Sequence, residues 1–226
     1  MSRYIQRKGK QARWTHGITV ISCIYLMISG LFVFIPALTA ALPAEVVVFI
    51  RMSHRVIGVV FVAVPLISAL MAPQGVKHIF KNLFAKWDKN DFIFMALFVP
   101  YLLFPKLVHM PDQHEVKSGQ RFADGMLWIS GLAMALSGVV LLLGDTVLAF
   151  TPFAMAVARM VHDIFFLVMA IFACAHIYLG AGIFQPYRGT HKIMFGNGQV
   201  SESDALYHWG DWAREELESG KNVVER

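Results

Sequence analysis

The chain has 226 residues, of which 57% are hydrophobic and only 15% carry a charge. A typical soluble domain is about 45–50% apolar and about 25% charged, so this composition argues against a soluble enzyme, a disordered chain and a nucleic-acid-binding module. The net charge of +5 does not change this, because the basic residues lie between long apolar runs. Two cysteines, Cys23 and Cys174, are too few for a disulfide framework or a tetrahedral metal site, whereas nine histidines are many for so apolar a chain.

Four apolar stretches are long enough to cross a bilayer, which needs about 20 helical residues. We predict that these spans cover approximately residues 17–42, 56–72, 126–143 and 153–184. The run 92–104 contains Pro100 and is too short to span comfortably, so we interpret it as re-entrant or interfacial. The N-terminus resembles a signal peptide, but its apolar run exceeds the roughly 7–15 residues of a signal sequence and predicts an uncleaved first helix.

The basic residues predict the orientation of the chain. Seventeen of the 20 lysines and arginines lie in the N-terminal tail, the loop 73–121 and the tail after residue 184. Positive charge favours the cytoplasmic side. The sequence therefore predicts an all-α integral membrane four-helix bundle over 1–184, with both termini cytoplasmic and a cytoplasmic tail over 185–226.

Two segments outside the spans are candidate surface helices. Apolar residues alternate with lysines over 77–89, which is typical of an amphipathic helix on the inner membrane surface. The alternative is an ordinary basic loop. Residues 202–218 form a second candidate, a surface helix that docks on a partner.

Four histidines in or at the spans sort by depth into two pairs. His54 and His162 are toward the outer side, and His16 and His176 are toward the inner side. His162 and His176 are 14 residues apart, which places them on nearly one helix face and roughly 21 Å apart along the axis. Ionisable residues within spans are costly and usually functional. Two pairs of histidines suit haem, which needs one histidine on each side, whereas a zinc or copper site usually needs more than two protein ligands. The alternative is a set of hydrogen-bonded interior side chains.

The five remaining histidines are expected to be solvated surface side chains: His78, His109, His114, His191 and His208.

An arginine stands three residues before three of the four span histidines, at Arg13, Arg51 and Arg159. Residues i and i+3 share a helix face, and arginine binds carboxylates bidentately, so these side chains are candidate partners of haem propionates. The alternative is the cationic flank that spans usually have. Ser-Gly pairs at 29–30, 130–131 and 137–138 would let a helix backbone approach a haem, or serve helix packing alone.

Several motifs together carry a family resemblance. They are the opening Arg13-Trp14-Thr15-His16, His54 at the second span, the His162/His176 spacing, the segment Lys117-Ser118-Gly119-Gln120-Arg121, and Arg188-Gly189-Thr190 followed by the Trp209/Trp212 region. With these motifs the chain resembles the gamma (cytochrome b) subunit of membrane-bound respiratory formate dehydrogenases. It is similar, more loosely, to the cytochrome b subunits of nickel–iron hydrogenases and thiosulfate reductases.

The resemblance implies two b haems, an outer one held by His54 and His162 and an inner one held by His16 and His176. It implies that electrons arrive from an iron–sulfur (beta) subunit bound to a catalytic (alpha) subunit, in a complex that can form higher oligomers. They would reduce menaquinone or another quinone near the cytoplasmic face of the bacterial inner membrane. The chain itself would not act on formate. The quinone pocket of the family maps, beside His176, onto Ser118, Gly119, Gln120, Leu179 and Gly180.

Two other functions stay open at this point. One is the matching cytochrome b subunit of a nickel–iron hydrogenase or another molybdenum oxidoreductase. The other, from a different class, is a transporter that uses histidines for metal ions or protons and is colourless.

Overall fold

The computed structural model describes residues 2–183 and 187–225, without the side chains of Asp145 and Leu179. Four helices in this part of the chain are long and apolar enough to cross a membrane. They are α1 (Lys10–Phe34), α3 (Ala44–Met71), α6 (Ser118–Thr146) and α7 (Pro152–Gly180). The predicted all-α architecture with four spans is confirmed.

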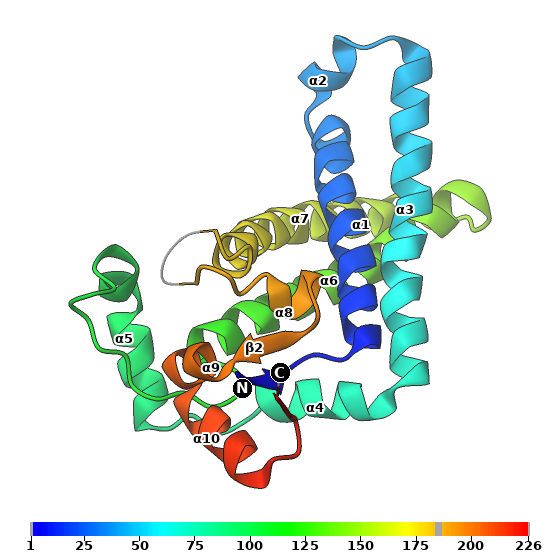
Figure 1. Cartoon of the computed structure of the whole chain (residues 1–226). Helices are drawn as coiled ribbons and strands as arrows, with labels where there is room; N and C mark the ends of the chain where they lie inside the picture. Colours follow the sequence, from blue (N-terminus) through cyan, green and yellow to red (C-terminus); the bar gives the residue numbers. More distant parts are fainter. Residues whose placement is uncertain (1, 184–186, 226) are drawn as a thin grey trace. The chain divides into compact units, whose positions relative to one another are not determined.

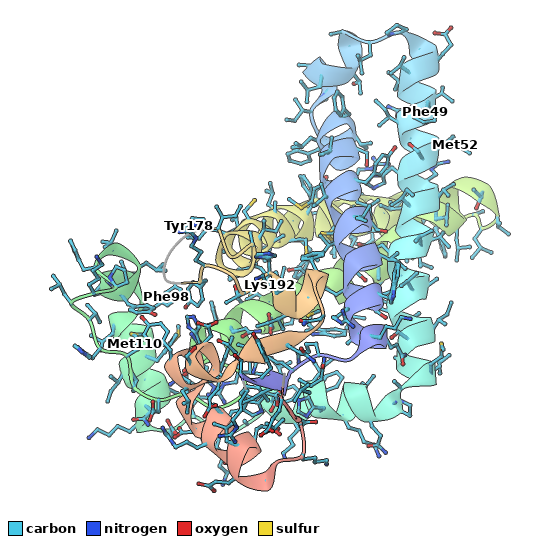
Figure 2. The ribbon with its side chains drawn as sticks, viewed as in Figure 1. Phe49, Met52, Phe98, Met110, Tyr178 and Lys192 are labelled. Atoms are coloured by element: carbon cyan, nitrogen blue, oxygen red, sulfur yellow. The ribbon has the colours of Figure 1, made fainter. Side chains whose placement is uncertain are left out.

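The surfaces of these helices are apolar, as a lipid environment requires. No residue in the most apolar part of α3 is buried within the protein. Figure 2 shows Phe49 and Met52 on α3, among the side chains that stand out from the helix. Their exposed fractions are 68% and 53%. A helix that is apolar around its whole circumference is stable in hydrocarbon, whereas water would penalise each of these side chains.

The observed helices begin earlier than predicted. α3 starts at Ala44 and so contains His54 in its interior rather than at its start. α6 starts at Ser118, so the segment Ser118-Gly119-Gln120 is its first turn and not part of a loop. Charged and polar residues interrupt the apolar signal near these helix starts, as Arg51, His54 and Arg55 do in α3, so the predicted starts of α3 and α6 lie too late in the chain. The predicted end of the fourth span at residue 184 lies outside the described residues.

The first span also ends earlier than predicted, because proline interrupts it. α1 stops at Phe34, and Pro36 begins the short helix α2 (Pro36–Ala40). The residue before a proline is disfavoured in the α conformation. Ile35 accordingly has φ −106° and ψ 99°, in the extended region.

The chain divides into two compact units. The first, which we call the membrane unit, comprises Thr15–Met71 and Met126–Ala173. The second, which we call the terminal unit, comprises Met1–Trp14, Ala72–Gly125 and Cys174–Arg226. The predicted domain boundary at 184/185 falls among residues that the structure does not describe.

The membrane unit contains an antiparallel hairpin of α1 and α3, which lie side by side (Figure 1). Near one end the Thr15 hydroxyl donates to Ser68 Oγ at 2.8 Å. Further along, the Tyr25 hydroxyl donates to Ser53 Oγ at 2.5 Å. A second hairpin joins α6 to α7, and its contacts build the candidate site described below.

The terminal unit is built on a three-stranded antiparallel sheet in the order β2-β1-β3. The strands are β1 (Arg3–Gln6), β2 (Gln199–Ser201) and β3 (Val223–Glu225). Tyr4 lies opposite both Ser201 and Val224, so the N-terminal strand pairs with the C-terminal tail on both edges. Strands this short have no visible sequence period, and the sheet was not predicted.

A small apolar core covers this sheet with helices α8 (Lys192–Phe195), α9 (Glu202–His208) and α10 (Gly210–Ser219). Its buried members are Ile5, Ile193, Val200, Ala205, Trp209, Trp212 and Ala213. The prediction of one helix over 202–218 is wrong. The helix breaks at Trp209, whose φ of −142° and ψ of 57° lie outside the helical region.

Two further helices occupy the predicted cytoplasmic loop. α4 (Pro73–Leu83) confirms a helix in the lysine-rich segment, but it ends before Trp87. α5 (Lys89–Leu103) contains most of the short apolar run and begins with a capping box between Asp88 and Asp91. Capping by two carboxylates satisfies the first free backbone N–H groups of the helix. An interfacial or re-entrant position for α5 stays a prediction.

Candidate functional site

Two imidazoles face each other inside the membrane unit. His54 comes from α3 and His162 from α7, and their ring centroids lie 6.5 Å apart with an angle of 71° between the ring planes. Two imidazole nitrogens bound on opposite sides of one metal, each about 2 Å from it, would hold the ring centroids roughly 6 Å apart. The separation therefore suits a metal centre between the rings.

Each imidazole is held from behind by a serine on the other helix of its own hairpin. Ser29 Oγ on α1 lies 2.8 Å from His54 Nδ1. Ser137 Oγ on α6 lies 3.0 Å from His162 Nδ1. A histidine that ligates a metal usually has its second ring nitrogen fixed in this way. Nε2 is thus the nitrogen available for ligation on both rings.

The glycine after each serine makes room for the imidazole. A Cβ atom on Gly30 would lie 3.6 Å from His54 Cε1, and one on Gly138 would lie 3.4 Å from His162 Cε1. Any larger side chain would press on the ring. The third Ser-Gly pair differs, because a Cβ on Gly131 would meet the flexible end of Met169 at 3.6 Å.

The two hairpins repeat one sequence pattern, which combines the Ser-Gly pairs and the arginines already noted in the sequence. In each hairpin a Ser-Gly pair precedes the histidine with a separation of 25 residues between serine and histidine. In each, Arg-Met stands three and two residues before the histidine, at Arg51-Met52 and Arg159-Met160. This match was the available signal that His54 and His162 are equivalent positions.

The predicted inner histidines belong to different compact units. His16 lies in the membrane unit and His176 in the terminal unit, near the end of α7. His176 Nδ1 lies 3.7 Å from Asp124 Oδ1. Asp124 also accepts a hydrogen bond from the Gln120 side chain one turn earlier on α6. The predicted site did not include Asp124. An acidic residue near the start of an apolar span is unusual and could have indicated a functional position.

Ser118 and Gly119, two of the predicted quinone residues, contact α5 and the loop before α6. The buried Ser118 hydroxyl lies 2.7 Å from Asp91 Oδ1 and 2.9 Å from Gln113 Oε1. A Cβ on Gly119 would lie 3.3 Å from the ring of Phe94. Both residues thus position the start of α6 against α5.

An ion pair between Asp91 and Arg121 completes this contact, and both side chains are almost fully buried. Burial alone would raise the pKa of Asp91. Hydrogen bonds from Arg121, the Asp88 backbone and Ser118 outweigh that effect and hold the pKa below its ordinary value. The carboxylate therefore stays charged and keeps α5 and α6 together.

The two remaining quinone candidates lie at the end of α7. Gly180 is exposed, and a Cβ placed on it would meet nothing within 4 Å. The side chain of Leu179 lies outside the described part of the chain.

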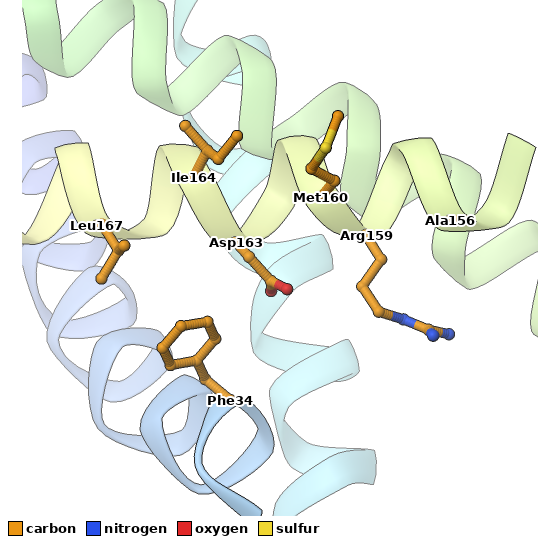
Figure 3. A pocket seen from close by; sticks show the side chains of 7 residues that line it. All are labelled: Phe34, Ala156, Arg159, Met160, Asp163, Ile164 and Leu167. Atoms are coloured by element: carbon orange, nitrogen blue, oxygen red, sulfur yellow. The ribbon is translucent and has the colours of Figure 1, made fainter.

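The three arginines occupy different surroundings. Arg13 donates to the Gly196 carbonyl in the terminal unit. Arg51 and Arg159 are exposed in the membrane unit. Arg159 lines an open pocket with Asp163 and Phe34, and Figure 3 shows Arg159 and Asp163 projecting from α7 on the side where Phe34 lies.

A buried lysine forms a second polar cluster in the terminal unit. Lys117 Nζ lies 3.0 Å from His208 Nδ1 and 4.8 Å from the ring centre of Tyr187. Burial, with a smaller contribution from Arg7, lowers the pKa of Lys117 to about 7. His208 is only 6% exposed, so its prediction as a surface histidine is wrong, whereas His78, His109, His114 and His191 are exposed as expected.

Comparison with known proteins identifies the family. A model of the prokaryotic cytochrome b561 family matches residues 7–197. The chain belongs to the prokaryotic cytochrome b561 family. No curated protein sequence matches it. This cytochrome b561 is therefore a multi-pass membrane protein that binds b-type haem and transfers electrons.

The residues of the membrane unit fit such a haem. His54 and His162 supply one imidazole from each hairpin, and Gly30 and Gly138 leave space for the rings. Among the described residues, no group of three or more His, Cys, Asp and Glu side chains could hold a metal ion. A cofactor that needs only two protein ligands suits this arrangement better than a bare metal ion does.

Proposed function

We propose that this cytochrome b561 passes electrons through two b haems to a quinone, with the outer haem held by His54 and His162. The observation that carries the proposal is the 6.5 Å separation of the two imidazoles, each with a serine at Nδ1. Haem supplies the one-electron chemistry when bound. The two hairpins supply the ligands, their orientation and the space around them.

His16 and His176 are the proposed ligands of the inner haem. The assignment is supported by the sequence, which predicts that both histidines lie at a similar depth toward the inner side of their spans. The carboxylate of Asp124 near His176 Nδ1 adds a second argument, because carboxylates often orient a ligating imidazole and raise its basicity.

The proposed complex is a respiratory formate dehydrogenase, in which this chain is the gamma-type subunit. An iron–sulfur (beta) subunit bound to the catalytic (alpha) subunit would deliver electrons at the outer haem, and menaquinone or another quinone would accept them near the cytoplasmic face. Among the proposed quinone residues, Gln120 has the strongest support, because its side chain bonds Asp124 beside His176. Ser118 and Gly119 would act through the position of α6, and Leu179 and Gly180 would border the pocket.

Haem content tests the electron-transfer proposal. The protein is purified from bacterial membranes, and its reduced-minus-oxidised spectrum and haem-to-chain ratio are measured. Two haems per chain are expected, with one lost in His176→Ala. Absence of a Soret band would overturn the proposal and favour a transporter that uses its histidines to bind metal ions or protons.

The identity of the complex needs a separate experiment. Membranes that contain the cytochrome receive either formate or hydrogen, and reduction of the b haem is followed by its absorbance. Reduction by formate supports the formate dehydrogenase. Reduction by hydrogen alone would assign the chain to a nickel–iron hydrogenase instead.

A further inference from the structure

The serine at Nδ1 of each outer histidine donates its hydroxyl hydrogen to a backbone carbonyl of its own helix. Ser29 Oγ donates to the Tyr25 carbonyl at 2.8 Å, one turn earlier on α1. Ser137 Oγ donates to the Ala133 carbonyl at 2.7 Å, one turn earlier on α6. A hydroxyl has one hydrogen but two lone pairs. Each serine therefore meets its imidazole as an acceptor.

This arrangement determines the tautomer of both rings. Because the serine oxygen accepts, His54 and His162 each carry the proton on Nδ1 and leave a lone pair on Nε2. Donation from Nδ1–H makes the opposite nitrogen more basic. A more basic ligand stabilises ferric iron relative to ferrous iron, because it donates more electron density to the metal.

We propose that Ser29 and Ser137 are positioning residues that lower the reduction potential of the haem held by His54 and His162. The inference rests on the proposed function, since it needs a haem at this pair. Both serines contribute in the same direction, because the two hairpins repeat the Ser-Gly and Arg-Met pattern at the same separation from the histidine. The outer haem would thus have two ligands with the same tautomer and a serine at each Nδ1, while His162 has a further hydrogen bond to the Met134 backbone.

α6 provides a matched control two turns before Ser137. Ser130 is fully buried, and its hydroxyl donates to the Met126 carbonyl at 2.7 Å, the same local bond that Ser137 makes. In the described part of the chain, its hydroxyl contacts this carbonyl and no imidazole. Ser130→Ala therefore removes a buried hydroxyl from the same helix without altering a histidine.

The test is an optical redox titration of the full-length protein with its haem, in the wild type and in Ser29→Ala, Ser137→Ala and Ser130→Ala. We expect Ser29→Ala and Ser137→Ala to raise the midpoint potential of the same haem and to leave the other haem unchanged, with the smaller rise in Ser137→Ala, where His162 keeps its hydrogen bond to the Met134 backbone. Ser130→Ala should shift neither. Electron paramagnetic resonance of the ferric protein should show altered g values for the same haem only.

Cysteine variants cover the case in which alanine prevents haem loading. Ser29→Cys and Ser137→Cys replace the hydroxyl with a somewhat larger thiol that is a weaker acceptor, so a smaller rise in potential than in the alanine variants is expected. Potentials that match those of Ser130→Ala in every haem-loaded variant would overturn the inference and leave the haem assignment intact. A wild-type protein without haem would overturn the proposed function itself.

Discussion

The carboxylate of Asp124 lies 3.7 Å from Nδ1 of His176, and the two residues come from the ends of different membrane helices. At this distance the carboxylate acts on the imidazole through its charge, which favours a proton on Nδ1 and leaves Nε2 as the ligating nitrogen. The Asp124 carboxyl can also take up and release a proton beside the proposed site of quinone reduction.

Asp124→Asn should raise the potential of the inner haem and slow quinone reduction by roughly 10- to 100-fold, the usual effect of losing such a partner. Redox titration and quinol formation by membranes measure the two effects. Glu115→Gln is the matched control, because Glu115 pairs with His78 at 2.8 Å in the same unit. Equal effects of both variants would contradict a specific role for Asp124.

His54→Ala and His162→Ala should each remove the same haem. Both imidazoles are needed for bis-histidine ligation, so each single variant should retain about one haem of two, and the double variant should lose no more. Haem-to-chain ratios and the position of the reduced α-band measure this result. His191→Ala, at an exposed position, should keep both haems. Loss of different haems in the two single variants would contradict a shared site.

Gly138→Val should lower the occupancy of the outer haem. Its branched side chain would extend beyond the Cβ position, which already lies 3.4 Å from His162 Cε1, and would tilt the ring. Gly58→Val is the control, because a Cβ on Gly58 would meet nothing within 4 Å. Haem content per chain is the measurement, and full occupancy in Gly138→Val would show that the ring tolerates displacement.

Stability of the terminal unit should rise with pH between about 7 and 10.5. Burial lowers the pKa of Lys117 to about 7 in the folded protein from 10.5 in the unfolded chain. In that interval the unfolded state binds more protons than the folded state, so raising the pH favours folding. The destabilising effect of burying the charged form of Lys117 is fully present below pH 7. It is absent above pH 10.5, the pKa of this lysine in the unfolded chain.

Urea unfolding of the terminal unit, followed by tryptophan fluorescence, should give a higher midpoint at pH 9.5 than at pH 7. Lys117→Met should flatten this dependence, because it replaces the titrating group with an apolar side chain of similar length. Lys106→Met is a control at an exposed lysine. An unchanged pH dependence in Lys117→Met would assign the effect to other groups.

The four spans were predictable because each is an apolar run long enough to cross a bilayer, and in hydrocarbon a helix satisfies all the backbone hydrogen bonds within such a run. The outer pair was predictable because His54 and His162 stand out in apolar sequence. Their serines were not assigned, since Ser29 and Ser137 also match the pattern of ordinary helix packing. The contact of each hydroxyl with Nδ1 depends on how the two helices of a hairpin pack, which the sequence does not reveal.

The terminal unit was largely beyond prediction from the sequence. Its strands are three or four residues long, and β1, near the start of the sequence, pairs with Gln199–Ser201 and Val223–Glu225, near its end. The break at Trp209 depends on the packing of Trp209 and Trp212 in the small core, which no local propensity reveals. A role for Asp124 was not predicted, because its partner His176 lies on another helix.

The pairing of β1 with β2 and β3 limits how the chain can enter a membrane. A sheet cannot form across a bilayer, so the two ends of the chain must be on one side, and the number of crossings must be even. β1 is made before the four membrane helices, but its partner strands β2 and β3 follow α7, the last of the four. The sheet can therefore close only after all four membrane helices between its strands have been made, so its pairing requires each of them to be inserted first.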